Sequence, residues 1–282
     1  MKVCVTGASG KAGRAVVADL MAHGHWVVST DLRMPVPDDL DEPRFPLADL
    51  TDYGQAIEVL QDVEAVVHLA NIPAPDIKTP AVTFNQNMAM NFNVFKAAAH
   101  VGLRRVVWAS SETTLGLPFD VPPKYAPIDE DHFPFPTTTY ALSKVASETV
   151  ASHIAQWSGM PFVALRFSNI LGPAAYAEFP ALWDKPEVRR WNLWSYIDER
   201  DAAAACRLAL EADVAGSPSF IIAAADSVMT RPSAELMGEV FPDVPLRGPV
   251  EGCESLLSSD RAREALGFVP QHSWRDLVPV PD

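Results

Sequence analysis

The stretch "KVCVTGASGKAG", residues 2–13, decides the fold. A short apolar run leads directly into three glycines, Gly7, Gly10 and Gly13, and a helical pattern follows from residue 11. Glycines between a strand and a helix permit a tight turn and let backbone N–H groups approach a pyrophosphate. The spacing is G-x-x-G-x-x-G rather than the usual G-x-G-x-x-G. The prediction of dinucleotide binding therefore rests on the place of the glycines, directly after the first predicted strand and at the start of the first predicted helix. A tight turn without a ligand is the alternative.

The first two thirds of the chain continue this alternation of apolar runs and helical patterns. The runs are too continuously apolar for strands exposed on one face, which indicates a parallel sheet covered on both faces. We predict strands at residues 2–6, 25–30, 64–70, 104–110 and 161–167, and helices near 11–22, 51–61, 81–101 and 138–158. The predicted fold class is therefore α/β, with a doubly wound parallel sheet and right-handed connections.

The alternation breaks after residue 170. Residues 171–193 and 226–282 are rich in proline and show little periodicity, apart from a short helical pattern near 259–266. We interpret them as a small substrate-binding cap over the carboxyl edge of the sheet, where such folds bind ligands. Residues 1–170 are then the dinucleotide-binding domain, to which a late strand and helix from about 194–225 return.

Composition narrows the possible partners and compartment. The 36 acidic and 22 basic residues give a net charge of −14, which disfavours nucleic acid. Cys4, Cys206 and Cys253 show no metal-type spacing, so we expect no metal and a reduced, cytoplasmic protein. No apolar run approaches the ~20 residues that span a bilayer, and the glycine turn follows the N-terminus too closely for a signal peptide.

Asp31 follows the second predicted strand in the stretch "STDLR", residues 29–33. It lies 18 residues after Gly13, about where a carboxylate hydrogen-bonds the adenosine ribose. Its charge would repel a 2′-phosphate, so we predict NAD rather than NADP, although the nearby Arg33 could accept that phosphate. Alternatively, Asp31 only caps a loop.

The stretch "YALSK", residues 140–144, places Tyr140 and Lys144 on one face of a predicted helix. A free tyrosine has a pKa of ~10 and is a poor base at neutral pH. A lysine ammonium one turn away would lower that pKa and make Tyr140 an acid/base catalyst. A pair that merely packs at helical spacing is the alternative.

Seven sequence features occur in order along the chain: "TGASGKAG" (6–13), Asp31, "ADL" (48–50), "HLAN" (68–71), "SSETTLG" (110–116), "YALSK" (140–144) and "LRFSNILGP" (165–173). As a set they resemble one known family, the extended short-chain dehydrogenases/reductases of the NAD-dependent epimerase/dehydratase group. The resemblance runs over about residues 1–215. The resemblance implies a Rossmann-type sheet, bound NAD and a Ser/Thr–Tyr–Lys triad.

Carried onto this sequence, the resemblance implies a site. Its catalytic residues are Ser111, Tyr140 and Lys144, with Ser110 as the alternative serine and Ser111 placed to hydrogen-bond the reacting oxygen. The cofactor-binding residues are Gly7, Ser9, Gly10, Lys11, Ala12, Gly13, Asp31, Asp49, Leu50, Leu69, Ala70, Asn87, Tyr140 and Lys144. The chain departs from the family pattern at Met90, where a glycine is usual.

The predicted substrate is small, polar and sugar-like. The serine is followed by a single glutamate rather than an acidic pair, which disfavours dehydration, and short relatives with a compact cap include uronate and aldose dehydrogenases. The expected substrate-binding residues are Asn71, Ser111, Glu112, Thr113, Ser168, Asn169 and Trp191. Trp183, Trp191 and Trp194 would close over a sugar face, or else anchor their own loop.

The leading hypothesis is thus an NAD-dependent oxidoreductase acting on a secondary alcohol or hemiacetal carbon. A nucleotide-sugar epimerase that keeps NAD tightly bound is the first alternative. A regulator that senses NAD without turnover is the second, and the retained Tyr140–Lys144 pair argues against it. We expect a homodimer through helices 81–101 and 138–158, because relatives pair there.

Overall fold

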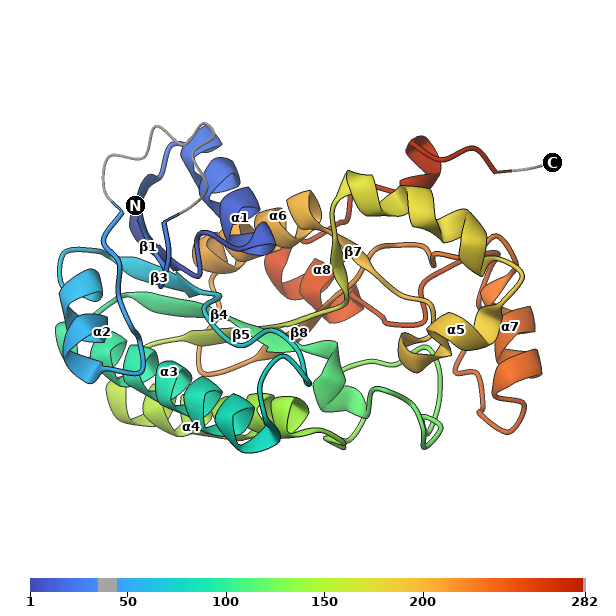
Figure 1. Cartoon of the computed structure of the whole chain (residues 1–282), viewed down its shortest axis with the longest axis horizontal. Coiled ribbons are helices and arrows are strands. Elements are labelled where there is room, and N and C mark those ends of the chain that lie inside the picture. Colours follow the sequence, from blue (N-terminus) through green and yellow to red (C-terminus); the bar gives the residue numbers. More distant parts are fainter. Residues whose placement is uncertain (35–44, 281–282) are drawn as a thin grey trace.

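The computed structural model describes residues 1–34 and 45–280. Its centre is a parallel sheet of six strands in the order β2-β1-β3-β4-β5-β8 (Figure 1). The strands are β1 (Lys2–Thr6), β2 (Trp26–Thr30), β3 (Ala65–His68), β4 (Arg105–Ser111), β5 (Phe162–Phe167) and β8 (Ser219–Ile222). Each pairing between neighbouring strands is parallel, so the predicted doubly wound α/β fold is confirmed.

Helices cover both faces of this sheet, as Figure 1 shows. One face carries α1 (Lys11–Ala22), α6 (Glu199–Glu211) and α8 (Asp260–Leu266), and the other carries α2 (Tyr53–Leu60), α3 (Pro80–Val101) and α4 (Thr139–Ser158). Successive strand residues point to opposite faces. Along β1, Val3 and Val5 therefore pack with α1 and α6, whereas Cys4 packs with the other layer. Burial on both faces explains the continuous apolar runs.

The topological switch point of the sheet positions the candidate site. β2 pairs with one edge of β1, and the chain then crosses over so that β3 pairs with the other edge of β1. The strand order therefore reverses at β1. Ligands of doubly wound sheets bind in the crevice beyond the carboxyl ends of the strands at such a reversal. β3 ends at His68, two residues earlier than predicted. Leu69 N still donates to the Thr6 carbonyl oxygen at 3.1 Å, but Ala70 N donates to the Thr6 side-chain Oγ1, at 3.3 Å.

The remaining elements gather mostly beyond the carboxyl ends of the strands, in the right half of Figure 1. They are β6 (Ile170–Leu171), β7 (Ile197–Asp198), α5 (Pro186–Arg189), α7 (Ser233–Val240) and four 3₁₀ helices: η1 (Glu112–Leu115), η2 (Pro173–Leu182), η3 (Arg190–Asn192) and η4 (Trp274–Asp276). A third apolar cluster joins both predicted cap segments around Trp194 and Trp274. The exact division into domain and cap stays a prediction.

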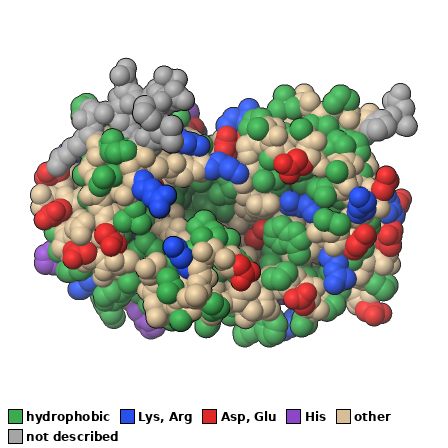
Figure 2. Space-filling model, in the orientation of Figure 1, with side chains coloured by type: hydrophobic (Ala, Val, Ile, Leu, Met, Phe, Trp, Pro, Cys, Tyr) green, Lys and Arg blue, Asp and Glu red, His purple; other side chains and the backbone are tan. Residues whose placement is uncertain are grey.

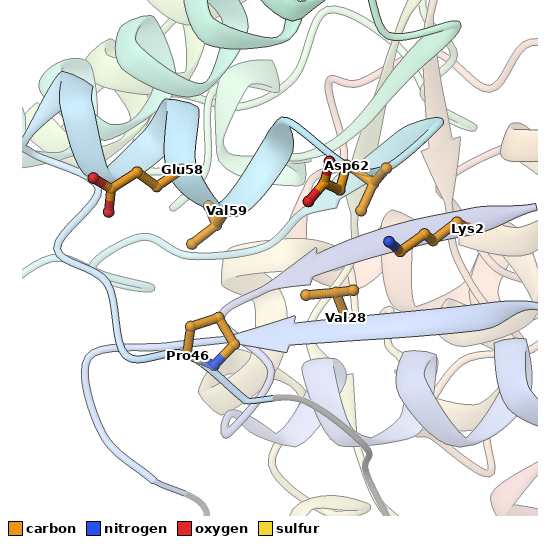
Figure 3. A pocket seen from close by; sticks show the side chains of 7 residues that line it. Lys2, Val28, Pro46, Glu58, Val59 and Asp62 are labelled. Carbon is orange, nitrogen blue, oxygen red and sulfur yellow. The ribbon is translucent and has the colours of Figure 1, made fainter.

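A small pocket lies between the first two strands and α2 (Figure 3). Its volume is about 10 Å³, with Lys2, Glu58 and Asp62 among its lining residues, so it has room for about one water. It is not the candidate site. Within the described part of the chain, no helix is long and apolar enough to cross a membrane.

Candidate active site

The glycine turn packs against the neighbouring strand so closely that side chains would not fit. Gly7 has a φ of +70°, and a Cβ there would lie 2.7 Å from the backbone N of Ala70. A Cβ on Gly13 would lie 2.1 Å from the Gly7 carbonyl oxygen. Gly10 precedes α1 and caps it without a side-chain hydrogen bond, which leaves first-turn N–H groups available to a phosphate.

Asp31 lies beside this turn and is oriented by backbone groups. Its Oδ2 accepts from Ser9 N at 3.0 Å, and its Oδ1 accepts from Leu32 N at 2.6 Å. The Ser9 hydroxyl in turn donates to the Arg33 carbonyl oxygen at 2.7 Å. A partly exposed carboxylate held at the end of the second strand suits ribose hydroxyls.

Lys144 is buried beneath the crevice and fixed by two acceptors. Its Nζ donates to the Ala109 carbonyl oxygen at 2.8 Å and to Asn71 Oδ1 at 3.1 Å. An ammonium has three donors, so one remains for a ligand such as a ribose hydroxyl. Asn71 is itself held by Asn91, whose Oδ1 accepts from Asn71 Nδ2 at 2.8 Å. Burial lowers the pKa of Lys144 to about 7.

Tyr140 meets Ser111 at the carboxyl end of β4, as the predicted triad requires. The predicted lowering of the Tyr140 pKa is wrong for this structure, because burial raises that pKa to about 12. The hydrogen bond with Ser111 lowers it and the charge of Glu112 raises it further. Lys144 Nζ lies 5.6 Å from the centre of the Tyr140 ring, and its charge does not offset the desolvation. Tyr140 is therefore a neutral phenol at neutral pH.

The structure distinguishes the two candidate serines. Ser110 donates to Glu148 Oε1 at 2.6 Å, and Glu148 also binds Arg166 through two hydrogen bonds of 3.0 and 2.8 Å. Ser110 thus belongs to a structural ion-pair network. Ser111 instead accepts from Thr113 Oγ1 at 2.9 Å and reaches Tyr140, which favours it as the serine of the triad.

The Glu112 carboxylate, which was expected to bind substrate, is instead hydrogen-bonded by donors of the protein. Its Oε2 accepts from the Ser168 hydroxyl at 2.7 Å, its Oε1 accepts from Asn192 Nδ2 at 3.3 Å, and the Asn169 backbone N–H also binds it. Burial raises the pKa of Glu112 to about 7, against these hydrogen bonds and the charge of Arg189. Ser168, Asn169 and Glu112 therefore contact one another, and the predicted direct contacts of these three with substrate stay predictions.

The other predicted cofactor residues take varied places. Lys11 is exposed and its Nζ lies 3.4 Å from the Ile170 carbonyl oxygen, and Ala12 continues the first turn of α1. Asp49 Oδ1 accepts from the backbone N–H and the hydroxyl of Thr51, and Leu50 is buried. Leu69 and Ala70 lie against the glycine turn. Asn87 is fully buried, and its amide binds both backbone groups of Ile72, at 2.8 and 3.1 Å.

The tryptophans of the cap differ in role. Trp194 is fully buried and donates to the Pro186 carbonyl oxygen at 2.7 Å, so it anchors its loop and cannot close over a substrate. Trp183 donates to the Val228 carbonyl oxygen at 3.1 Å. Trp191 is partly exposed, with the Arg189 guanidinium 5.2 Å from its ring centre, and remains the candidate for a substrate contact.

Sequence reasoning did not single out two buried asparagines behind the triad, Asn91 and Asn192, whereas His68 was expected to be a packed residue of a buried strand, as it is. His68 binds Thr6 and Asn91, at 2.7 and 3.0 Å, and burial lowers its pKa to about 3, so it is neutral. Asn91 lies one helical turn after Asn87, a spacing that would have identified it as facing the same side. No comparable signal marks Asn192, which reaches Glu112 from a distant segment.

These residues fit a dinucleotide. The glycine cradle, the N-terminus of α1, Asp31 and the remaining donor of Lys144 lie along the crevice at the carboxyl edge. Figure 2 shows a hollow near the centre of this face, between the two halves of the molecule, with basic side chains around its rim. Among the residues that the structure places, no His, Cys, Asp or Glu cluster could hold a metal ion.

The sequence model of the NAD-dependent epimerase/dehydratase family matches residues 3–223. The chain belongs to this family. The resemblance inferred from the motifs is thereby confirmed, and so is the predicted cofactor, since the family is NAD-dependent. Its members among the relatives include both epimerases and dehydrogenases, which leaves the reaction to be argued from the site.

Three similar proteins illustrate this range. A UDP-glucose 4-epimerase of Corynebacterium glutamicum is 26% identical over 97% of this chain and 92% of its own length. An NAD-dependent glucose-6-phosphate dehydrogenase of Haloferax volcanii is 28% identical over 64% of this chain and 74% of its own. A short-chain dehydrogenase/reductase superfamily protein from Agrobacterium tumefaciens, solved with bound NAD, superposes with a TM-score of 0.75 at 23% identity, covering 97% and 94%. At that identity the superposition shows the fold alone.

Proposed function

We propose that this protein is an NAD-dependent oxidoreductase that transfers hydride between the cofactor and a secondary alcohol or hemiacetal carbon of a small, sugar-like substrate. The observation that carries the proposal is the meeting of Ser111 with Tyr140 at the carboxyl end of β4, with Lys144 Nζ held by two acceptors 5.6 Å from the Tyr140 ring centre. A regulator that only binds NAD would not need this buried, hydrogen-bonded set.

The residues suggest how the proton is handled. Bound NAD would supply the hydride acceptor or donor. Ser111 would hydrogen-bond the substrate oxygen, and Tyr140 would exchange a proton with that oxygen. Because the Tyr140 pKa is about 12, the resting phenol holds the proton that carbonyl reduction consumes but is a weak acid, and alcohol oxidation first requires loss of that proton. Oxidation by the enzyme should accordingly speed up as the pH rises above neutral.

A nucleotide-sugar epimerase is the second candidate. It is supported by the similarity to an epimerase that extends over nearly the whole of both chains. Such an enzyme would interconvert sugars with no net formation of NADH. The two proposals are therefore separated by whether NADH accumulates.

The test is NADH absorbance when the protein and NAD meet a panel of aldoses, uronic acids, polyols and secondary alcohols. We expect one class to give a signal and Tyr140→Phe to reduce its kcat by about 10²-fold or more while leaving the Kd for NAD nearly unchanged. Tyr53→Phe, on α2, is the matched control and should keep full activity. Turnover by Tyr140→Phe at the normal rate would show that another group moves the proton. Silence across the panel, with interconversion of nucleotide sugars, would favour the epimerase.

A further inference from the structure

Glu112 joins two separate parts of the chain. It directly follows Ser111, and only 3% of it is exposed. On one side it accepts from Ser168, just after β5, and on the other from Asn192, in η3. A buried carboxyl with donors on both oxygens has a fixed position. It therefore holds a negative charge, when ionised, beside the catalytic serine.

The turn that faces Glu112 is strained. Leu193 and Trp194 have φ of 53° and 59°, in the left-handed region that residues other than glycine rarely adopt. The turn lets Asn192 Nδ2 and Arg189 Nη2 both donate to the Ser195 carbonyl oxygen, at 2.8 Å each. Strain of this kind persists where surrounding contacts impose it, often at functional sites. Here the strained turn brings an amide and a guanidinium toward Glu112.

Two other ionisable groups face Glu112. Its charge acts on Tyr140 of α4, whose pKa it raises, and on Arg189 of α5. Arg189 is also drawn to the Ser195 carbonyl and to the ring of Trp191, so it offsets the carboxylate only in part. Because the charge of Glu112 acts electrostatically on Tyr140, it also acts on a substrate bound beside Tyr140.

We propose that Glu112 determines specificity by favouring neutral, hydroxylated substrates over anionic ones. This inference rests on the proposed oxidoreductase function and names the substrate class of that site. A second negative charge about 10 Å away, at an effective dielectric constant of ~20, would be disfavoured about tenfold. A uronate carboxylate or a sugar phosphate would meet this repulsion, whereas an aldose or polyol would not.

The test compares an aldose with the uronate of the same configuration, which differ by one charge. We expect kcat/KM with NAD to be about tenfold or more higher for the aldose than for the uronate. If the uronate is not oxidised, its affinity is measured instead as an inhibition constant against the aldose. Glu112→Gln, nearly the same shape without the charge, should lower this ratio about tenfold. Arg189→Met should move it the opposite way. Glu178→Gln, an exposed change on η2, is the control and should leave it unchanged.

The pH dependence of the same ratio gives a second readout. Because the Glu112 pKa is about 7, the carboxyl is ionised above pH 7 and loses its charge below it. The preference for the aldose should therefore weaken as the pH falls from about 8 to 6, while a uronate stays ionised. Lys144 has a pKa of about 7 and titrates in the same range, so Glu112→Gln isolates the contribution of Glu112.

The outcomes separate this inference from the one it rests on. No NADH from any substrate would contradict the oxidoreductase function itself. NADH formation with the uronate preferred, or with a ratio that neither pH nor Glu112→Gln alters, would overturn the role of Glu112 alone. Should Glu112→Gln fail to fold, as thermal denaturation would show, the Arg189→Met comparison decides.

Discussion

Single residues of this site take their chemistry from burial as much as from their neighbours in sequence. Tyr140 and Lys144 lie one helical turn apart, which the spacing predicted, yet the pKa of the phenol rises and that of the ammonium falls. Desolvation penalises the charged form of both groups, and at this depth it exceeds the opposing effects of the Ser111 hydrogen bond on Tyr140 and of the Glu148 charge on Lys144. A sequence gives spacing but not depth, so the direction of the Tyr140 shift could not be predicted from it.

Asp31 carries the prediction of cofactor preference at this scale. Asp31→Asn keeps the shape but removes the charge that would repel a 2′-phosphate. We expect the Kd for NAD to rise about tenfold, the effect of one lost charge-assisted hydrogen bond, and the preference for NAD over NADP to fall by at least as much. Fluorescence titration with both cofactors measures this. Asp62→Asn, exposed beyond α2, is the control, and an unchanged NAD/NADP ratio in Asp31→Asn would show that other groups select the cofactor.

At the scale of elements, local periodicity was enough for the sheet and its helices but not for the cap. The strands and helices before residue 170 agree with the predicted ranges to within a few residues, because each buries a regular pattern. The two-residue strands β6 and β7 have no such pattern, and among the described residues they form a separate sheet in which they pair with each other. The left-handed turn at Leu193 depends on contacts with residues about 80 positions earlier, which no local signal contains.

The strand–turn–helix unit at the N-terminus gives a prediction at this scale. A Cβ on Gly13 would lie 2.1 Å from the Gly7 carbonyl oxygen and 2.7 Å from the Ala8 Cα, and both are backbone atoms that cannot move aside alone. Gly13→Ala should therefore displace the turn, destabilise the protein by about 1–3 kcal/mol and weaken NAD binding more than tenfold. Thermal denaturation and NAD titration measure these effects.

Gly238→Ala supplies the matched control for that change. Gly238 lies on α7, where an added Cβ meets nothing within 4 Å, so alanine should be neutral or stabilise by up to about 1 kcal/mol. Equal effects of the two substitutions would mean that the turn tolerates a side chain and that its glycines do not serve close approach.

At the scale of the whole molecule, the outer surface of α3 and α4 is more apolar than a solvated face requires. The two helices pack side by side against the sheet, and Phe92 on α3 and Leu142 on α4 are each 46% exposed, while Trp157 near the end of α4 is 71% exposed. Exposed apolar side chains gathered on neighbouring helices are typical of an interaction surface. This pattern is consistent with the predicted homodimer, which stays a prediction.

The dimer can be tested by placing charges on that surface. Phe92→Glu combined with Leu142→Glu should raise the dimer dissociation constant about thirtyfold or more, the effect of about 2 kcal/mol, because a carboxylate would be buried against its own copy. Sedimentation velocity across a concentration series measures it. Val269→Glu, at an exposed site near α8, should leave the association state unchanged. A wild-type protein that sediments as a monomer at all concentrations would refute the dimer. Full activity of that monomer would show that one chain completes the site.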